Sequence, residues 1–426
     1  MIVEVLLVSP SVAPPSLLRQ PKAVWAVAFA CVIAFMGIGL VDPILPAISA
    51  DLGATAAQTM LLFTSYLLVT GFAMFFTSYV SSRIGAKKTL LIGLGLIVVF
   101  AALAGASDSV GMIIGFRAGW GLGNALFIST ALATIVGAAS GGANNAVILY
   151  EAALWLGIAV GPLLGGALGS ISWRGPFFGT AVLMAIALIA LLLLLGKGTS
   201  RPEPVALTAT FRALRHPALL TLGLASLFYN FGFFSLLAWS PFPLEAAAHA
   251  AGGTEFGAHE LGLIFCGWGL ALALTSVFVA PVLTRRFGRR RTLYAMLGAL
   301  AVVMAVLAIE VANLTVLIIG IVVGGLFLGV MNTVLTESVM EATDLPRTVA
   351  SSTYSGVRFV GGAAAPALAG VIAGVLGNGA PYWIGCAGLL IAAGVLWVGR
   401  AHLARIDTHL DEDVLDEAVA LTAADA

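Results

Sequence analysis

The chain contains 426 residues, of which 60% are hydrophobic and only 9% are charged. Soluble globular proteins contain about 25% charged residues, so this composition excludes a protein solvated by water over most of its surface. The 20 basic and 20 acidic residues balance, and we expect the lipid bilayer rather than nucleic acid as a partner. The three cysteines lie in separate apolar stretches without the spacing of a metal site, so we expect neither a metal nor another cofactor.

Twelve segments are long and apolar enough to cross a bilayer as helices, which requires about 20 residues. Six precede a polar stretch near residue 200 and six follow it: 24–48, 57–80, 87–107, 111–136, 145–171 and 175–196, then 218–244, 259–284, 292–312, 314–338, 348–376 and 378–399. Pro43 and Pro46 interrupt the first of them. The sequence therefore predicts an all-α membrane protein with two bundles of six helices.

The Lys and Arg residues of the loops are concentrated in alternate loops, which is typical of loops that face the cytoplasm. The opposite loops hold only Arg174, and the spans hold Arg117 and Arg358. We therefore predict a multi-pass protein with both termini in the cytoplasm. Its expected parts are an N-terminal bundle (1–197), a central cytoplasmic linker (198–217), a C-terminal bundle (218–400) and an acidic cytoplasmic tail (401–426).

Two features of the first half recur in the second half. The turn after the second span contains Arg83, Gly85 and Lys87, and the turn after the eighth contains Arg286 and Gly288. In the fifth span, Tyr, Gly, Pro and Gly at positions 150, 157, 162 and 166 recur at positions 354, 361, 366 and 370 of the eleventh. Such internal repeats are typical of secondary transporters, whose substrate site lies between the repeats. The basic turns also anchor orientation, which by itself explains most of their side chains.

The fourth span carries an arginine, Arg117, followed by several glycines. Placing an arginine in hydrocarbon costs at least about 2.5 kcal/mol, so such a residue normally faces a cavity and finds a partner. Gly115, Gly119 and Gly123 lie four residues apart and permit close packing of a neighbouring helix. Packing explains the glycines, and for Arg117 we favour a functional role over a purely structural ion pair.

The fifth span combines small residues with a proline. Gly157, Gly161 and Gly165 lie on one helix face, where they permit tight packing, and Gly166 follows. Pro162 removes a backbone hydrogen bond and favours a kink. We expect this helix to act as a packed hinge at which the two halves move past each other.

These features resemble the major facilitator superfamily in its cytoplasmic loop signature (78–88), its fourth-helix arginine with glycines (117–124) and its fifth-helix glycine–proline segment (157–166). The last segment resembles the motif of exporters, particularly drug:proton antiporters. Ser78 and Ser82 stand where the family usually has Gly and Asp, so its cytoplasmic charge latch is not inferred here. The resemblance implies two pseudo-symmetric bundles that enclose a cleft opening alternately to either side.

The resemblance also implies that the first and fourth helices line the cavity, which would bring Asp42 and Arg117 within reach of each other. We hypothesise that Asp42 is the proton-coupling carboxylate and Arg117 its gating partner, since burial favours the neutral acid and a guanidinium favours the carboxylate. Glu151, at the start of the fifth span, is a second candidate for proton coupling or substrate contact. Alternatively, Asp42 ends the first helix beside Pro43, and Glu151 is a solvated acid at a helix start.

A substrate pocket is expected from helices four and seven, because the resemblance places both beside the cavity. Its candidate side chains are Trp120, Asn124, Phe127, Tyr229, Asn230 and Phe233. Such a pocket would be apolar, aromatic and only lightly polar, which suits bulky lipophilic or cationic compounds. The alternative is that many of these aromatic residues face lipid.

The sequence therefore predicts a proton-coupled secondary exporter, a monomer in the bacterial cytoplasmic membrane that expels small lipophilic or cationic compounds by alternating access. Export or uptake of a sugar, siderophore or other metabolite is the alternative transporter function. Neither a membrane enzyme nor a channel is expected; for an enzyme, the reason is that all five histidines lie in loops or tails. No phosphate-binding loop of the GxxxxGK[ST] type is present, which disfavours ATP as the energy source.

Overall fold

The computed structural model describes residues 20–138, 143–196, 204–252, 256–345, 347–404 and 406, and its regular structure there is entirely helical. The first half contains α1 (Lys22–Gly39), η1 (Asp42–Ile44), α2 (Leu45–Asp51), α3 (Ala56–Ile84), α4 (Ala86–Gly105), α5 (Val110–Ala138), α6 (Ala143–Gly169) and α7 (Gly175–Leu194). The second half contains α9 (Pro217–Trp239), α10 (Pro241–Ala250), α11 (Ala258–Leu274), η2 (Thr275–Val279), α12 (Ala280–Phe287), α13 (Arg289–Ile309), α14 (Leu314–Glu341), α15 (Arg347–Leu376), α16 (Ala380–Val398) and η3 (Arg400–Leu403). A short helix, α8 (Ala209–Ala213), lies between the halves.

Eleven segments of the described chain are long and apolar enough to cross a membrane. The twelfth long helix is α5, with 29 residues, which carries Arg117 and Asn124. The segments α1–η1–α2 and α11–η2–α12 each correspond to one predicted span, so the long helices follow the predicted order. On the peripheral helix α7, Val182, Ile189 and Leu193 are exposed by more than half, as expected of side chains that face lipid.

The tight turns between α3 and α4 and between α12 and α13 each depend on one glycine. Gly85 has a φ of +88° and Gly288 a φ of +78°, a backbone conformation that other residues adopt only with strain. At the end of α7, Lys87 donates hydrogen bonds to the carbonyl oxygens of Leu195 and Gly196. The loop glycines Gly85 and Gly288 of the two repeats therefore have the same structural role, and Lys87 supplies the carbonyl groups at the end of α7 with a hydrogen-bond donor.

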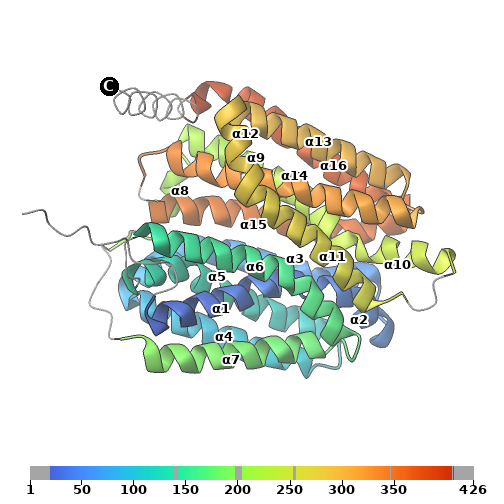
Figure 1. Ribbon diagram of the computed structural model, residues 1–426, viewed down its shortest axis with the longest axis horizontal. Helices are drawn as coiled ribbons and strands as arrows, with labels where there is room; N and C mark the ends of the chain where they lie inside the picture. Colours follow the sequence, from blue (N-terminus) through green and yellow to red (C-terminus); the bar gives the residue numbers. More distant parts are fainter. Residues whose placement is uncertain are drawn as a thin grey trace, which may run out of the picture.

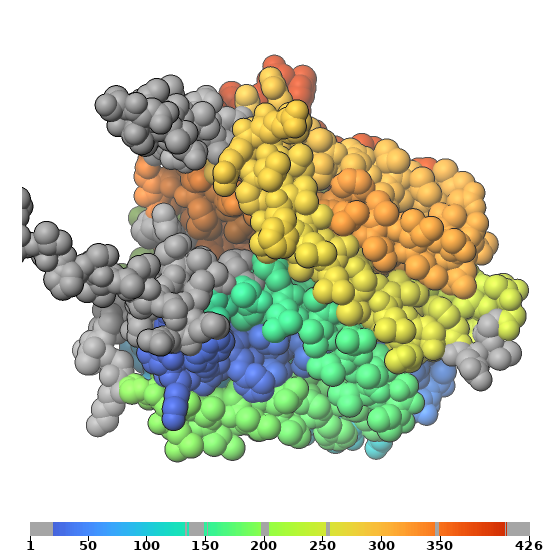
Figure 2. Space-filling view, in the orientation of Figure 1, coloured from blue at the N-terminus to red at the C-terminus, as the bar shows by residue number. Residues whose placement is uncertain are grey.

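The two halves lie one above the other in Figure 1, with the blue-to-green first half below and the yellow-to-red second half above. Two pairs of helices make the most extensive contacts between them: α3 packs against α15, and α6 packs against α11. In the space-filling view, the yellow α11 crosses onto the green α6, whereas α12 turns away from it toward the top (Figure 2). The helices α4 and α7 pack together on the outer side of the first half.

The sequence repeat appears as a repeated packing arrangement. In the first half, Gly157 of α6 faces the backbone of α1 at Val32, and in the second half Gly361 of α15 faces the backbone of α9 at Leu227. Further along the same two helices the glycines face the opposite half. A Cβ atom added to Gly166 would lie 2.5 Å from the carbonyl oxygen of Ala258 on α11, and one added to Gly370 would lie 2.5 Å from Cα of Ala57 on α3. Thus α6 and α15 each join their own bundle to the other.

The short helix α8 lies within the predicted linker and touches both halves. Phe211 stacks on Phe75 of α3 with ring centroids 5.4 Å apart, and Thr353 of α15 donates a hydrogen bond to the Thr210 carbonyl oxygen at 3.3 Å. Residues 197–203 of the linker region and 407–426 of the predicted acidic tail lie outside the described residues. The short helix α8 of the linker therefore packs against both halves.

Candidate functional site

A narrow cavity of about 50 Å³ lies between the two halves. Residues from six helices line it: Ile38 and Gly39 of α1, Trp155 and Ile158 of α6, Asn230, Phe233, Phe234 and Leu237 of α9, Trp268 and Leu272 of α11, Asn332 of α14, and Arg358 and Phe359 of α15. Drug-sized ligands occupy pockets of about 300–1,000 Å³. The cavity must therefore widen, by movement of side chains or of the halves, before it can hold such a molecule.

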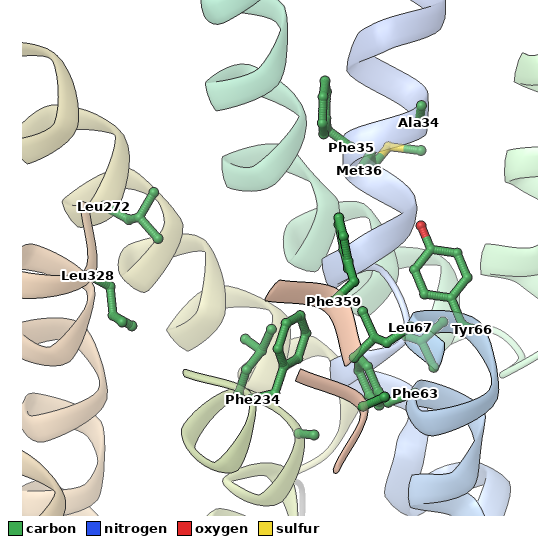
Figure 3. Close-up of a cluster of buried hydrophobic side chains, with 14 of the residues drawn as sticks. Ala34, Phe35, Met36, Phe63, Tyr66, Leu67, Phe234, Leu272, Leu328 and Phe359 are labelled. Carbon is green, nitrogen blue, oxygen red and sulfur yellow. The ribbon is translucent and has the colours of Figure 1, made fainter. Parts of the chain in front are cut away.

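Aromatic side chains dominate the wall of this cavity. Phe233 contacts Phe234 with ring centroids 4.8 Å apart and Trp268 at 5.7 Å, in edge-to-face geometry. Figure 3 shows Phe63, Phe234 and Phe359 approaching one another from α3, α9 and α15. Phe233 and Phe234 are neighbours on one helix, but the other contacts join different helices. The contact between Phe63 and Phe234, with ring centroids 6.4 Å apart, joins the two halves. The wall offers large apolar faces that suit aromatic or otherwise bulky apolar compounds.

One charged residue lies in the described lining, Arg358. Its Nη1 donates a hydrogen bond to Oδ1 of Asn332 at 2.7 Å, and its guanidinium lies 5.8 Å and 5.6 Å from the ring centroids of Tyr354 and Phe359. The Nε atom is buried without a hydrogen-bond partner. Arg358 is therefore held in place by an amide and two rings, and no described acid forms an ion pair with it.

Asp42 lies in η1, next to the helix that carries the glycine–proline segment. A Cβ atom added to Gly39 would lie 3.1 Å from Cγ of Pro162 and 3.5 Å from Oδ2 of Asp42, so the carboxyl group lies at the α1–α6 contact. Asp42 is fully buried, and neither of its oxygens has a hydrogen-bond partner. A buried carboxylate without partners is costly, so this group must either hold a proton or gain a partner when it ionises.

Arg117 is fully buried among aromatic rings and backbone carbonyls. Its guanidinium lies 4.3 Å from the ring centroid of Tyr66 and 4.7 Å from that of Trp120, and it donates long hydrogen bonds of 3.5 Å to the Leu62 and Gly37 carbonyl oxygens. No ion pair joins Arg117 to Asp42 among the described residues. Asp42 lies in η1, just after α1, and Arg117 lies on α5, which packs against α1.

The structure separates the six pocket candidates into two groups. Asn230 and Phe233 line the cavity, and Tyr229 packs beside Phe233 at 6.4 Å. By contrast, the three residues on α5 are fully buried within the first half and are absent from the described lining: Trp120, Asn124 and Phe127. Asn124 donates a hydrogen bond to the Tyr66 hydroxyl at 2.5 Å, and Trp120 packs over Gly37. In this conformation, α5 supplies the surroundings of Arg117 rather than a cavity wall.

The remaining candidates lie at helix contacts and turns. Gly161 and Gly165 of α6 face the backbone of α1 at Met36 and Leu40, and a Cβ atom added to Gly161 would lie 2.7 Å from the Met36 carbonyl oxygen. Arg83 and Arg286 lie at the ends of α3 and α12, where each guanidinium covers the ring of a neighbouring aromatic residue. The side chain of Glu151, on α6, lies outside the described part of the structure.

The sequence did not predict several residues of the lining, namely Trp155, Trp268, Asn332 and Phe359, and it placed Arg358 within a span without assigning it to the pocket. Trp155 and Trp268 have only apolar residues or glycine beside them in the sequence, so no change of polarity marks the face on which they meet the cavity. The available signals were Arg358 and Asn332, a charged and a polar residue within spans.

The model of the Major Facilitator Superfamily matches residues 27–250 and 246–413 of the chain. The chain belongs to this superfamily. It is 53% identical over 390 residues to the multidrug efflux protein YfmO of Bacillus subtilis (strain 168), covering 92% of this chain and 96% of that protein. It is also 30% identical over 214 residues to the quinolone resistance protein NorA of Staphylococcus aureus (strain MRSA252), covering 48% of this chain and 55% of that protein.

The crystal structure of the nucleoside transporter NupG superposes with a TM-score of 0.73 and 11% identity, covering 88% of this chain and 99% of that one. This likeness concerns the fold alone. The predicted family, the all-α membrane fold and the assignment to a transporter rather than an enzyme are thereby confirmed. The limits of the domains and the roles of the individual site residues stay predictions.

Proposed function

We propose that the chain is a proton-coupled exporter of small lipophilic compounds that works by alternating access. The observation that carries this proposal is the 53% identity to a multidrug efflux protein over 92% of the chain. The aromatic cavity between the halves supports it, because a wall of rings with three polar side chains, Asn230, Asn332 and Arg358, offers contact area rather than the many hydrogen bonds a sugar needs. The resemblance of 157–166 to the exporter segment supports the direction of transport.

The interface between α6 and α11 supports the alternating movement. Between α6 and α11, the close backbone contacts lie toward the Gly166 end, where Gly262 and Ala258 approach. With both termini in the cytoplasm, as the distribution of Lys and Arg favours, this end faces the outside of the cell. The described contacts then close the outer side of the cleft, and α12 turns away on the inner side (Figure 1). Export requires the α6–α11 contact to open so that the cavity reaches the exterior.

Asp42 is the proton carrier in this proposal, and Arg117 modulates it. The carboxyl group lies at the contact between α1 and α6, so a movement of α6 during opening changes its surroundings. A proton binds Asp42 when the group is buried without partners and leaves when Arg117 approaches, because the guanidinium stabilises the carboxylate. The glycine–proline helix thereby links the opening of the cleft to protonation.

The experiment compares accumulation of a fluorescent lipophilic dye in bacterial cells that express the chain, with and without a proton uncoupler. We expect the chain to lower accumulation, the uncoupler to abolish this effect, and Asp42→Asn to reproduce the uncoupled level. Asp108→Asn is the matched control, since Asp108 is highly exposed and forms only a surface ion pair with Arg174. Efflux that persists in Asp42→Asn and still responds to the uncoupler would remove Asp42 from the mechanism. Accumulation that is unchanged across a broad dye panel would overturn the exporter proposal.

A further inference from the structure

We propose that Arg358, held by Asn332 in the central cavity, is an anion-recognition site, and that the preferred substrates are aromatic compounds carrying a carboxylate or a similar anionic group. This inference rests on the proposed function, because it assigns a substrate class to the same cavity. It differs from the expectation of cationic compounds that the aromatic residues alone suggested.

The charge of the described lining is the first argument. Of the thirteen described residues around the cavity, Arg358 is the only charged one, and none is acidic. A cation entering this cavity would meet a fixed positive charge without a described counter-charge, in surroundings that screen charges poorly. An anion would instead supply the counter-charge that Arg358 lacks among the described residues.

The second argument is the balance of donors and acceptors. Two buried polar atoms of lining residues have no hydrogen-bond partner, Nε of Arg358 and Nε1 of Trp268, and both are donors. The Oδ1 acceptor of Asn332 is already occupied by Nη1 of Arg358 at 2.7 Å. A ligand that completes this set must bring acceptor oxygens, and a carboxylate brings two in the geometry that a guanidinium binds in a bidentate manner.

The third argument is the rigidity and neighbourhood of Arg358. The bond to Asn332 and the rings of Tyr354 and Phe359 hold the guanidinium in place, so little rotamer freedom is lost when a ligand binds. Phe233 and Trp268 belong to the same cavity wall and provide the apolar faces for an aromatic ring. The cavity thus combines a subsite that binds an anion with a subsite that binds an aromatic ring.

The test measures binding to the purified full-length protein by equilibrium dialysis with three probes that share one ring system: 2-naphthoate, 2-naphthamide and 2-naphthylmethylammonium. We expect the wild type to bind 2-naphthoate about tenfold more tightly than 2-naphthamide, and the ammonium probe most weakly. Arg358→Gln should lower the affinity for 2-naphthoate about tenfold and leave 2-naphthamide unchanged. Arg358→Lys, which keeps the charge but not the planar fork, should give an intermediate affinity.

Two further variants separate substrate recognition from a structural role. Asn332→Asp preserves the shape of the side chain and places a negative charge against Arg358, so it should lower 2-naphthoate affinity while the protein stays folded. Glu151 lies one helical turn before Trp155 on α6. If Arg358 served only as an ion-pair partner for Glu151, then Glu151→Gln and Arg358→Gln would change the affinity for all three probes alike.

Equal binding of the three probes by the wild type, preference for the ammonium probe, or an equal loss for all three in Arg358→Gln would each overturn the anion site. If Arg358→Gln does not fold, as judged by its thermal unfolding, Asn332→Asp decides. The experiments distinguish failure of this site from failure of the proposed function. A preference for the anionic probe without uncoupler-sensitive efflux would contradict the exporter function and leave the anion site. Uncoupler-sensitive efflux with a preference for the cationic probe would contradict the anion site and leave the exporter function.

Discussion

The sharpest test of the alternating movement is a methyl group at the contact between α6 and α11. In Gly166→Ala, the new Cβ atom would lie 2.5 Å from the Ala258 carbonyl oxygen and 2.9 Å from Cα of Gly262. Both neighbours are backbone atoms that cannot rotate away, so the helices must separate. Because this contact closes one end of the cleft, the substitution should favour the conformation in which that end is open.

The size of the effect follows from the cost of overpacking, which is about 1–3 kcal/mol. That cost falls on the closed conformation alone and corresponds to a roughly 5- to 150-fold change in the equilibrium. If about 99% of wild-type molecules are closed at this end, between about 95% and about 40% of the variant remain closed. Gly374→Ala, on the repeat helix α15, is the matched control, because a Cβ atom at Gly374 would have no other atom within 4 Å.

Pulsed electron spin resonance measures this shift of the conformational equilibrium as a change in the distance between two spin labels at the closed end. Spin labels are attached at Ser170 and His259, both exposed, after alanine replaces the three native cysteines, Cys31, Cys266 and Cys386. We expect one short distance in the wild type and in Gly374→Ala, and an added longer distance in Gly166→Ala. A folded Gly166→Ala protein with the wild-type distance distribution would show that this contact does not control the opening.

The remaining predictions concern two arginines. Arg289→Gln should lower the free energy of unfolding by about 2 kcal/mol, because Arg289 is buried, pairs with Glu341 at 2.7 Å and donates a hydrogen bond to the Ile406 carbonyl oxygen at 2.8 Å, while the partial exposure of Glu341 weakens the pair. Thermal unfolding in detergent measures this loss, and the exposed Arg285→Gln should show none. Arg117→Lys keeps the charge but not the planar stacking on the rings, so uncoupler-sensitive efflux should fall less than in Arg117→Gln. Equal efflux in the two variants would argue against a role for the charge.

The number of spans and the turns between them were predictable from the sequence because they depend on local chemistry. About 20 apolar residues define a span, and a basic turn with a glycine defines its end; Gly85 and Gly288 have the positive φ that such turns need. The repeat was also visible, because backbone contact permits only the smallest side chain. Gly157 and Gly361 therefore occupy corresponding positions in the two bundles.

The cavity wall was predictable only in part, because a helix in a membrane is apolar on the face that meets lipid and on the face that meets another helix. Phe127 and Phe233 are both phenylalanines within apolar spans, yet Phe127 packs inside the first half and Phe233 lines the cavity. Likewise, Trp120 was expected in the pocket and packs against Gly37, whereas Trp268 carried no signal and lies in the wall. Only the packing of whole helices separates these cases.

The charge of the substrate also sets how strongly the membrane potential drives export. One charge moving through 100 mV yields about 2.3 kcal/mol. If Asp42 is the one coupling carboxylate, as we propose, one proton enters for each molecule expelled. Export of a neutral compound in exchange for one proton then moves one net positive charge inward. Export of a monoanion moves the equivalent of two, which yields about 4.6 kcal/mol, whereas export of a monocation moves no net charge, so only the pH gradient drives it. The proposed anion site at Arg358 would therefore select the class of compound for which an exporter that takes up one proton has the largest driving force.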